Sequence, residues 1–409
     1  MFPSREWRPL VVFFTPEVDG GNGVIPIERQ FQSSLIRGLK RWLRGPMLVA
    51  LALAPAAAAP AGGQTNVVLS GPATCRQCRI ELEQVVAFGD STGPGMLQEQ
   101  SVIAADQRGR FYVTSAYDPT IAVFDARGRF LHRIGRKGQG PGEFTRRPTM
   151  LFGPGDTLYA LEGSTRRMTV FSPQYELVRT GTLGLSYSTA VRLPNGRFLL
   201  SGVSRSAEAI GYPLHLLDQN GAYIRSFGSA TGAQDLFAST SGTVRRFAAP
   251  VGETVWTVRA DELVLERWSA DGKKLAHTTR QAPWFPNSHL PPNANPGTHP
   301  DPPVVRSLSE DKAGLLWILT RVQDREWRPR TLPAHRDGTG PYVPDSLRHK
   351  LNDSVLEVID PARGAVLATR TFDSLFMGFI APNLLVSFDE DADGNPRYVV
   401  WRARLISPR

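Results

Sequence analysis

A pair of β-hairpins recurs along the chain, and this repeat constrains the fold more than any other feature of the sequence. In one hairpin an apolar strand passes through a short turn rich in Asp and Gly and continues as a second strand. Its copies are Ile121–Ile134, Met168–Val178, Leu214–Phe227, Leu265–Leu275 and Leu356–Leu367. A second hairpin precedes these copies, and it occurs as Val102–Val113, Met150–Ala160, Ala190–Leu200, Arg246–Trp256, Val305–Trp317 and Gly378–Val386.

Two hairpins make one four-stranded antiparallel unit, and the units recur about every 45 residues, as the blades of a β-propeller do. The last unit supplies three strands and ends with Arg397–Ile406. Its fourth strand is predicted to be Arg79–Phe88, because pairing the two ends of the chain removes an open sheet edge. The sequence therefore predicts an all-β, six-bladed propeller over residues 79–407, closed by its N-terminal strand. A β-sandwich is the alternative, but it fits six copies of one four-stranded unit poorly.

Glycine-rich segments join the predicted blades. Ile134–Phe144 (IGRKGQGPGEF) is the clearest copy, Phe88–Leu97 is weaker, and Phe227–Gly232 is degraded. These segments resemble the inter-blade signature of NHL-repeat and related bacterial six-bladed β-propeller proteins. The resemblance covers roughly Arg79 to Ile406; it implies the fold and says little about activity. Glycine lets the chain leave the outer strand of one blade and cross to the inner strand of the next.

The N-terminal region is typical of an export signal. Basic residues between Arg37 and Pro46 precede an apolar run, Met47–Ala59, and small residues for cleavage follow at Ala59–Ala61. The apolar run is shorter than the ~20 residues that span a bilayer. We therefore predict an unstructured extension over residues 1–35, whose start codon could be misplaced, and a cleaved signal peptide over residues 36–61. The mature protein is expected to be periplasmic or extracellular, without a stable membrane anchor; an uncleaved anchor is the alternative.

The two cysteines of the chain, Cys75 and Cys78, lie in a lead-in segment over residues 62–78. No His follows Cys78, so the pair is not a haem-attachment motif, and a zinc site would need further Cys or His ligands nearby. In an oxidising compartment the pair is predicted to form a local disulfide. A redox or metal role stays open as the alternative.

Two long insertions are predicted to lie on one face of the propeller, the face that carries the loops between blades and between the second and third strands of each blade. They are residues 281–303 and 321–353. Loops on one rim of a rigid scaffold commonly carry recognition, although Pro-rich stretches can also be spacers. Aromatic and cationic residues suited to a protein, peptide or glycan lie in them: Trp284, Trp327, Tyr342, Arg325 and Arg328. We therefore predict a monomeric recognition or scaffold module.

Arginines on the predicted inner strands form a second candidate site. Arg192, Arg246 and Arg306 occur in three successive blades, where a guanidinium facing the axis could bind a carboxylate or phosphate. The alternative is that each one pairs with a neighbouring acid or lies between blades. The formal net charge of +9 is a mild excess without a concentrated basic stripe, so no nucleic-acid partner is predicted.

No catalytic residue is predicted. Six-bladed propellers with calcium-dependent hydrolase or zinc lyase activity carry acidic or His clusters in the channel, and the predicted inner strands here show none. A metal-dependent hydrolase or lyase in the central channel stays as the alternative function. No cofactor is predicted apart from calcium, for which Asp389, Asp391 and Asp393 follow the D-x-D-x-D-G pattern of a calcium loop. A solvated hairpin tip is the alternative explanation of that pattern.

Overall fold

The structure, a computed structural model, describes residues 65–98, 101–204, 206–228, 244–286, 295, 297–333, 343, 345–348, 350–391 and 393–408. They belong to one compact unit, Pro60–Arg409. The predicted extension and signal peptide, residues 1–61, lie outside the described residues. No helix in the described part of the chain has the length and apolar character needed to cross a membrane.

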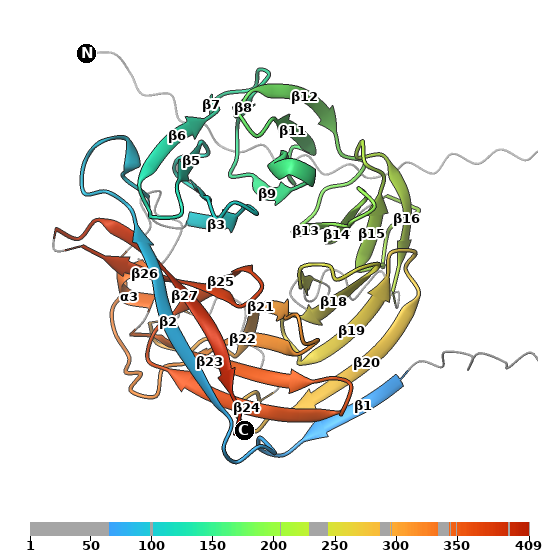
Figure 1. The fold of residues 1–409 in the computed structure, drawn as a ribbon, viewed down its shortest axis with the longest axis vertical. Coiled ribbons are helices and arrows are strands. Elements are labelled where there is room, and N and C mark those ends of the chain that lie inside the picture. The colour runs from blue at the N-terminus through green and yellow to red at the C-terminus, as the bar shows by residue number, and fades with distance from the viewer. Residues whose placement is uncertain are drawn as a thin grey trace, which may run out of the picture. The chain divides into compact units, whose positions relative to one another are not determined.

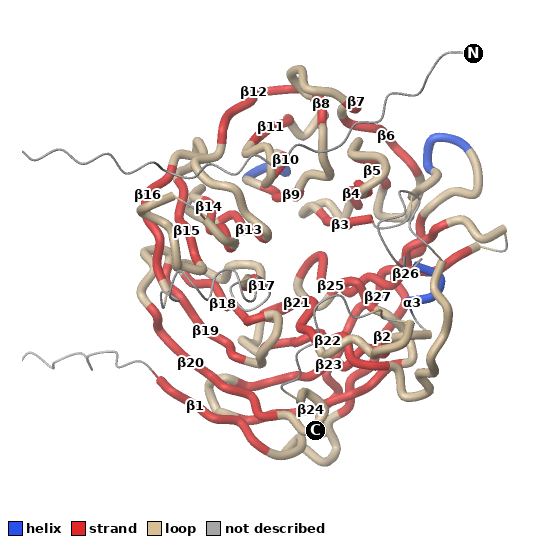
Figure 2. The backbone as a smooth tube through the Cα atoms, turned by 180° about the vertical axis from the view of Figure 1, so that it is seen from behind, coloured by secondary structure: helices blue, strands red, loops and turns tan. Residues whose placement is uncertain are grey.

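The blades surround a common axis, as Figures 1 and 2 show from opposite sides. There are six of them, each built on four antiparallel strands, and blade 4 carries a fifth strand. Blade 1 contains β3 (Ser101–Ala105), β4 (Phe111–Ser115), β5 (Ile121–Phe124) and β6 (Phe130–Ile134), and blade 2 contains β9 (Thr149–Phe152), β10 (Leu158–Glu162), β11 (Arg167–Phe171) and β12 (Leu177–Thr182). Blade 3 contains β13 (Thr189–Arg192), β14 (Phe198–Ser201), β15 (Leu214–Leu217) and β16 (Tyr223–Phe227), and blade 4 contains β17 (Arg245–Phe247), β18 (Thr254–Arg259), β19 (Val264–Ser269) and β20 (Lys274–Gln281). Blade 5 contains β21 (Val304–Glu310), β22 (Leu316–Gln323), β23 (Asn352–Asp360) and β24 (Ala365–Phe372), and blade 6 contains β25 (Phe376–Ala381), β26 (Leu384–Glu390), β27 (Pro396–Ile406) and β2 (Arg79–Phe88). The predicted six-bladed propeller is therefore confirmed.

The Asp and Gly positions of the repeat form the turns between the third and fourth strands. In blade 1 the Oδ1 atom of Asp125 accepts hydrogen bonds from the backbone amides of Arg127 and Arg129, both at 2.9 Å. Gly128 completes the turn with φ of 80°, a conformation that a residue with a Cβ rarely adopts. Asp218 makes the same pair of bonds in blade 3. The repeat thus encodes hairpin turns through local hydrogen bonding.

The hydrophobic core is divided among the interfaces between blades. Each of the six clusters of buried apolar residues contains side chains from two neighbouring blades. Phe144, which ends the glycine-rich segment after blade 1, is buried in the cluster between blades 1 and 2. A Cβ on Gly135 would lie 2.5 Å from the Phe144 ring, so this glycine lets the aromatic ring enter the interface. The short strands β7 (Arg136–Lys137) and β8 (Glu143–Phe144) pair within this segment.

The N-terminal strand closes the ring as predicted. β2 pairs antiparallel with β27, with Gln84 opposite Trp401, and Val85 is left out of the pairing by a bulge. A further strand, β1 (Thr65–Ser70), was not predicted: it pairs parallel with β20 as a fifth strand of blade 4. Between these strands the backbone amide of Thr74 donates a hydrogen bond to the Val366 carbonyl of blade 5, at 2.8 Å. Residues 65–88, here called the N-terminal strap, thus join blades 4, 5 and 6 along the rim (Figure 1).

The innermost strand of every blade begins on the same face, here called the entry face. Ser101, Thr149, Thr189, Arg245, Val304 and Phe376 are the first residues of these strands. Both long insertions also leave the propeller on this face, and they meet there. The amide of Arg330 donates a hydrogen bond to the Gly297 carbonyl at 2.8 Å. The predicted proximity of the two insertions is confirmed.

Candidate functional site

A cavity of about 630 Å³ opens on the entry face where blades 1, 5 and 6 meet. Its polar wall contains four arginines that come from separate segments. Arg147 precedes β9, Arg306 lies at a bulge of β21, Arg321 is near the end of β22, and Arg348 ends the short helix α3 (Asp345–Arg348). Phe376, Met377, Phe388 and Trp401 supply apolar surface. The cavity therefore combines converging cations with flat apolar groups.

Arg321 is the best-defined cation of this wall. Its Nη2 atom lies 3.2 Å from Asp301 Oδ2, and its buried Nε has no hydrogen-bond partner among the described residues. Burial lowers the pKa of Arg321, with an opposing contribution from Asp301 and a further lowering by the charge of Arg348. Burial also lowers the pKa of Arg147. Arginine stays protonated despite such shifts, so the positive charge of the wall is permanent at any ordinary pH.

Three acids face the same cavity: Asp373, Asp389 and Glu390. They are exposed, whereas Arg306, Arg321 and Arg348 are partly buried. The charge of an acid at a water-filled mouth is strongly screened by solvent, whereas the charge of an arginine in a partly desolvated wall is screened much less. The arrangement can therefore hold the negatively charged group of a ligand against the arginines, with polar contacts at the rim.

The three predicted inner-strand arginines do not gather at one place. Arg306 lines the cavity. Arg192 ends β13 at the opposite end of its strand and lies over the Tyr159 ring of blade 2, 4.9 Å from its centre. Arg246 lies on β17, where burial lowers its pKa. Of the three, the cavity includes Arg306 alone.

The predicted rim residues occupy different environments. Trp284 packs against the core cluster between blades 4 and 5, with its ring centroid 6.1 Å from that of Phe285. The side chain of Arg325 pairs with Asp353 at 3.4 Å, and Arg328 donates to the Trp327 carbonyl at 2.8 Å. Trp327 is partly buried, and its indole N–H has no hydrogen-bond partner among the described residues. Tyr342 lies outside the described residues. The predicted binding role of these residues stays a prediction.

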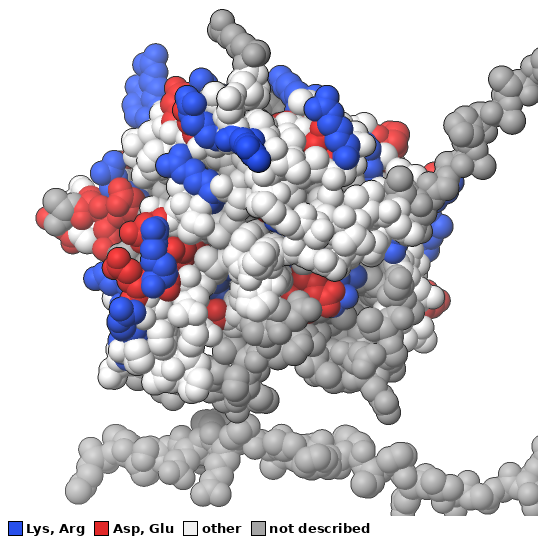
Figure 3. Space-filling model, turned by 90° about the horizontal axis from the view of Figure 1, so that it is seen from below, with Lys and Arg blue, Asp and Glu red and all other residues white. Residues whose placement is uncertain are grey.

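The predicted calcium loop is the β26–β27 hairpin. Asp391 Oδ1 accepts hydrogen bonds from the amides of Asp393 and Asn395, and Oδ2 accepts one from the Ser91 hydroxyl at 2.7 Å. These bonds, that of Ser91 first, lower the pKa of Asp391 to about 2. Asp389 lines the cavity, and Asp393 is exposed. Acidic side chains gather at the left edge in Figure 3, the side on which Figure 1 shows this hairpin. Both oxygens of Asp391 accept hydrogen bonds that stabilise the turn. These are the same oxygens that a calcium ion would need as ligands.

A different group of carboxylates comes together in blade 5. Asp324 follows β22, Asp353 is the second residue of β23, and Asp373 follows β24, and one oxygen from each lies within 4.8 Å of the other two. Burial raises the pKa of Asp353, and the charge of Asp324 adds to this effect. No local sequence pattern marks these residues, because the three strand ends meet only in the folded blade.

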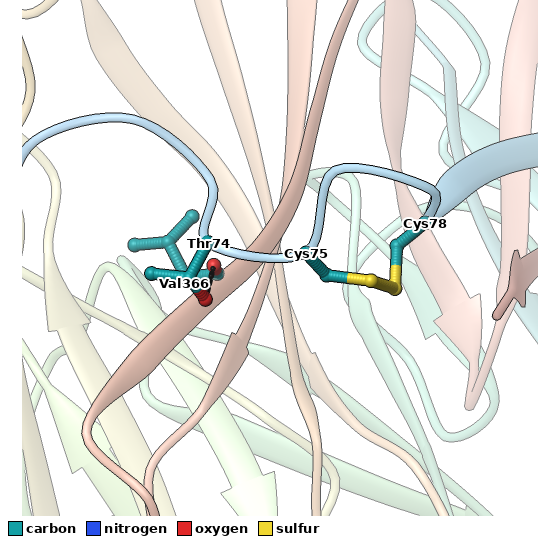
Figure 4. The surroundings of a disulfide bond; sticks show 4 residues. All are labelled: Thr74, Cys75, Cys78 and Val366. Carbon is teal, nitrogen blue, oxygen red and sulfur yellow. Dashed lines mark hydrogen bonds between the residues drawn. A yellow bond between two sulfur atoms is a disulfide. The ribbon is translucent and has the colours of Figure 1, made fainter. Parts of the chain in front are cut away.

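The two cysteines form the predicted disulfide within the N-terminal strap (Figure 4). Cys78 packs beside the core cluster between blades 5 and 6. Thr74, next to Cys75, donates both its amide and its hydroxyl to the Val366 carbonyl, at 2.8 and 3.0 Å. The disulfide therefore stiffens the chain between its contact with blade 5 and the start of β2.

The histidines bear on the alternative of a metal-dependent hydrolase or lyase. His215 is buried in blade 3, where its Nε2 donates to the Gly202 carbonyl and its Nδ1 accepts from the Ser226 hydroxyl. Burial lowers the pKa of His215, which favours the neutral form of the ring. His132 stacks on Tyr175 at 5.0 Å between centroids. These two rings serve packing and hydrogen bonding, and the alternative stays a prediction.

These features define a six-bladed β-propeller with a cavity on its entry face. Residues 97–264, less than half of the chain, match the DUF5128 family model, which is described as a 6-bladed beta-propeller. No curated protein matches the chain in sequence.

Solved structures support the same class. A Bacteroides fragilis protein predicted to be exported is similar with a TM-score of 0.53 and 11% identity, over 84% of this chain and 100% of that one. A duf4221 family member from Bacteroides vulgatus is similar with a TM-score of 0.50 and 12% identity, over 80% of this chain and 99% of that one. Virginiamycin B lyase from Staphylococcus aureus has a TM-score of 0.41 and 8% identity, over 81% of this chain and 100% of that one, and this likeness carries no argument about activity. The resemblance to NHL-like propellers is confirmed at the level of the fold.

Proposed function

We propose that the protein is an exported recognition module that binds a carboxylate-bearing ligand in the cavity of the entry face. An acidic peptide or an acidic glycan would supply that chemistry. The observation that carries the proposal is the convergence of Arg147, Arg306, Arg321 and Arg348 on one cavity. Planar guanidinium groups bind carboxylates through paired hydrogen bonds, and partial burial strengthens such bonds.

The apolar part of the wall supports a ligand larger than a simple ion. Trp401 is held in place by a hydrogen bond from its indole N–H to the Ser387 hydroxyl, at 2.8 Å. Its ring and that of Phe388 line the cavity next to the charged groups. A flat apolar surface beside a cation suits a peptide backbone or the face of a sugar ring. The likeness to a protein predicted to be exported supports a role outside the cytoplasm.

The test is isothermal titration of the mature protein with two probes, a hexaglutamate peptide and a trigalacturonate oligosaccharide. Arg306→Gln and Arg321→Gln should each weaken binding about 10-fold or more, because each removes a charge-assisted hydrogen bond. Added salt should weaken the binding of the wild type. Arg127→Gln is the matched control, since Arg127 is exposed in a turn on the opposite face. Equal affinity in all three variants, or no binding of either probe by the wild type, would overturn the proposal.

A further inference from the structure

The three carboxylates of blade 5 lie where its outer three strands reach the entry face. Asp324 and Asp353 are 6% and 1% exposed, whereas Asp373 is exposed. The amide of Glu326 donates to Asp324 Oδ1 at 2.6 Å, which fixes the orientation of that carboxylate. Two buried acids and one accessible acid therefore share a space in which one oxygen from each is within 4.8 Å of the others.

Asp353, the more deeply buried of the two buried acids, has one oxygen atom without a hydrogen-bond partner in the described part of the chain. Asp353 Oδ2 lies 3.4 Å from Arg325 Nε, and the Arg325 side chain is 60% exposed. Asp353 Oδ1 is buried and has no hydrogen-bond partner among the described residues. A buried carboxylate oxygen that lost its water must recover a comparable interaction, or the fold loses free energy. Arg325 is exposed, so its guanidinium is a weak, solvent-screened partner for the buried Asp353 carboxylate.

We propose that Asp324, Asp353 and Asp373 bind a calcium ion. The group offers oxygen atoms alone, which are the ligands of hard cations, and it contains no Cys or His that would favour zinc. Oxygens bound to calcium at about 2.4 Å can lie up to about 4.8 Å apart across the ion, while magnesium requires a tighter octahedron at about 2.0–2.1 Å. Water completes the coordination on the exposed side, at Asp373.

This site is separate from the hairpin that resembles a calcium loop in sequence. In the hairpin, amide and hydroxyl donors occupy both oxygens of Asp391. In blade 5, Asp353 Oδ1 receives no such donor from the described residues. An ion here would link the end of β22, the start of β23 and the end of β24, and with them both ends of the insertion over residues 321–353. Asp373 also belongs to the cavity wall, so the ion would fix one edge of the cavity.

The experiment adds CaCl₂ to the EDTA-treated, dialysed mature protein. Calorimetry measures the binding, and thermal melting with and without calcium measures the change in Tm. We expect one ion per chain, with a Kd on the order of 10⁻⁴–10⁻³ M as in extracellular modules, and a rise in Tm on adding calcium. Asp373→Asn and Asp353→Asn should each weaken binding about 10-fold or more and remove most of the rise in Tm. MgCl₂ should bind more weakly. Asp393→Asn, an exposed change in the β26–β27 hairpin, should bind like the wild type.

Three outcomes would overturn this site. The first is no heat and no change in Tm with the wild type up to about 10 mM CaCl₂, a concentration well above the expected range. The second is wild-type affinity in Asp373→Asn, which decides the matter alone if Asp353→Asn fails to fold. The third is loss of binding in Asp393→Asn, which would move the site to the hairpin. No anionic probe is present, so these outcomes are independent of the proposed recognition function.

Discussion

Removing the side chain that anchors the closing strand should weaken the whole ring. Ile80 on β2 is 1% exposed and belongs to the core cluster between blades 5 and 6, opposite Leu405 of β27. Ile80→Ala leaves a cavity among closely packed side chains, and such changes cost about 2–5 kcal/mol. We expect a loss of about 3 kcal/mol in the free energy of unfolding, because β2 has blade 5 on one side and β27 on the other and cannot collapse freely.

The matched control is Val85→Ala in the same strand. Val85 is 40% exposed and lies at the bulge, outside the pairing with β27, so its truncation should cost no more than about 0.5 kcal/mol. Urea denaturation followed by tryptophan fluorescence and circular dichroism measures both variants and tests whether the two probes report one transition. A cost for Ile80→Ala below about 1 kcal/mol, or equal to that of Val85→Ala, would refute the reasoning. A soluble, cooperatively folded protein that lacks residues 80–88 would refute it as well, since that deletion exposes the apolar edge of β27.

Two further predictions concern the N-terminal strap and blade 3. The double change of Cys75 and Cys78 to Ser should cost at most about 2 kcal/mol and leave the propeller folded in a thermal melt, because the disulfide closes a very short loop; unfolding of the double variant would show a larger role. For His215, burial lowers the pKa below the usual value of about 6.5, so the unfolded chain takes up a proton that the folded protein does not. The contribution of neutral His215 to the free energy of unfolding is fully present above about pH 6.5, and it decreases as the pH falls toward the lowered pKa of the folded protein. His215→Gln should therefore reduce the decrease in Tm between pH 7.5 and pH 5, and an unchanged pH profile would contradict this.

Local sequence chemistry predicts the blades well. The Asp and Gly of each turn act within a few residues, as Asp125 and Gly128 show, so the hairpins can be recognised without knowledge of the fold. The pairing of β2 with β27 could be predicted because the last blade lacked a strand and the N-terminal part of the chain supplied one. β1 could not be predicted from the sequence. It is a single short strand that pairs in parallel with an already complete blade, so no hairpin partner lies next to it in the sequence.

The site could be predicted only in part. Arg306 was identified from its place on an inner strand, but Arg147, Arg321 and Arg348 come from a loop, a strand end and a short helix that meet only in the ring. The pattern at Asp389–Asp393 matches a calcium loop in spacing, yet the backbone of its own turn uses the oxygens of Asp391. Spacing shows which side chains can converge, but it does not show which hydrogen-bond donors already occupy their oxygens.

The N-terminal strap has a consequence for how the protein is made. Its two strands leave the ribosome before any blade, but their partners, β20 and β27, are among the later elements of the chain. Both pairings must therefore wait while most of the propeller is synthesised, and contacts so distant in sequence form slowly. A chain that stops before β27 leaves β2 with an unpaired edge, which invites aggregation or degradation. The ring can therefore close only after β27 has been made.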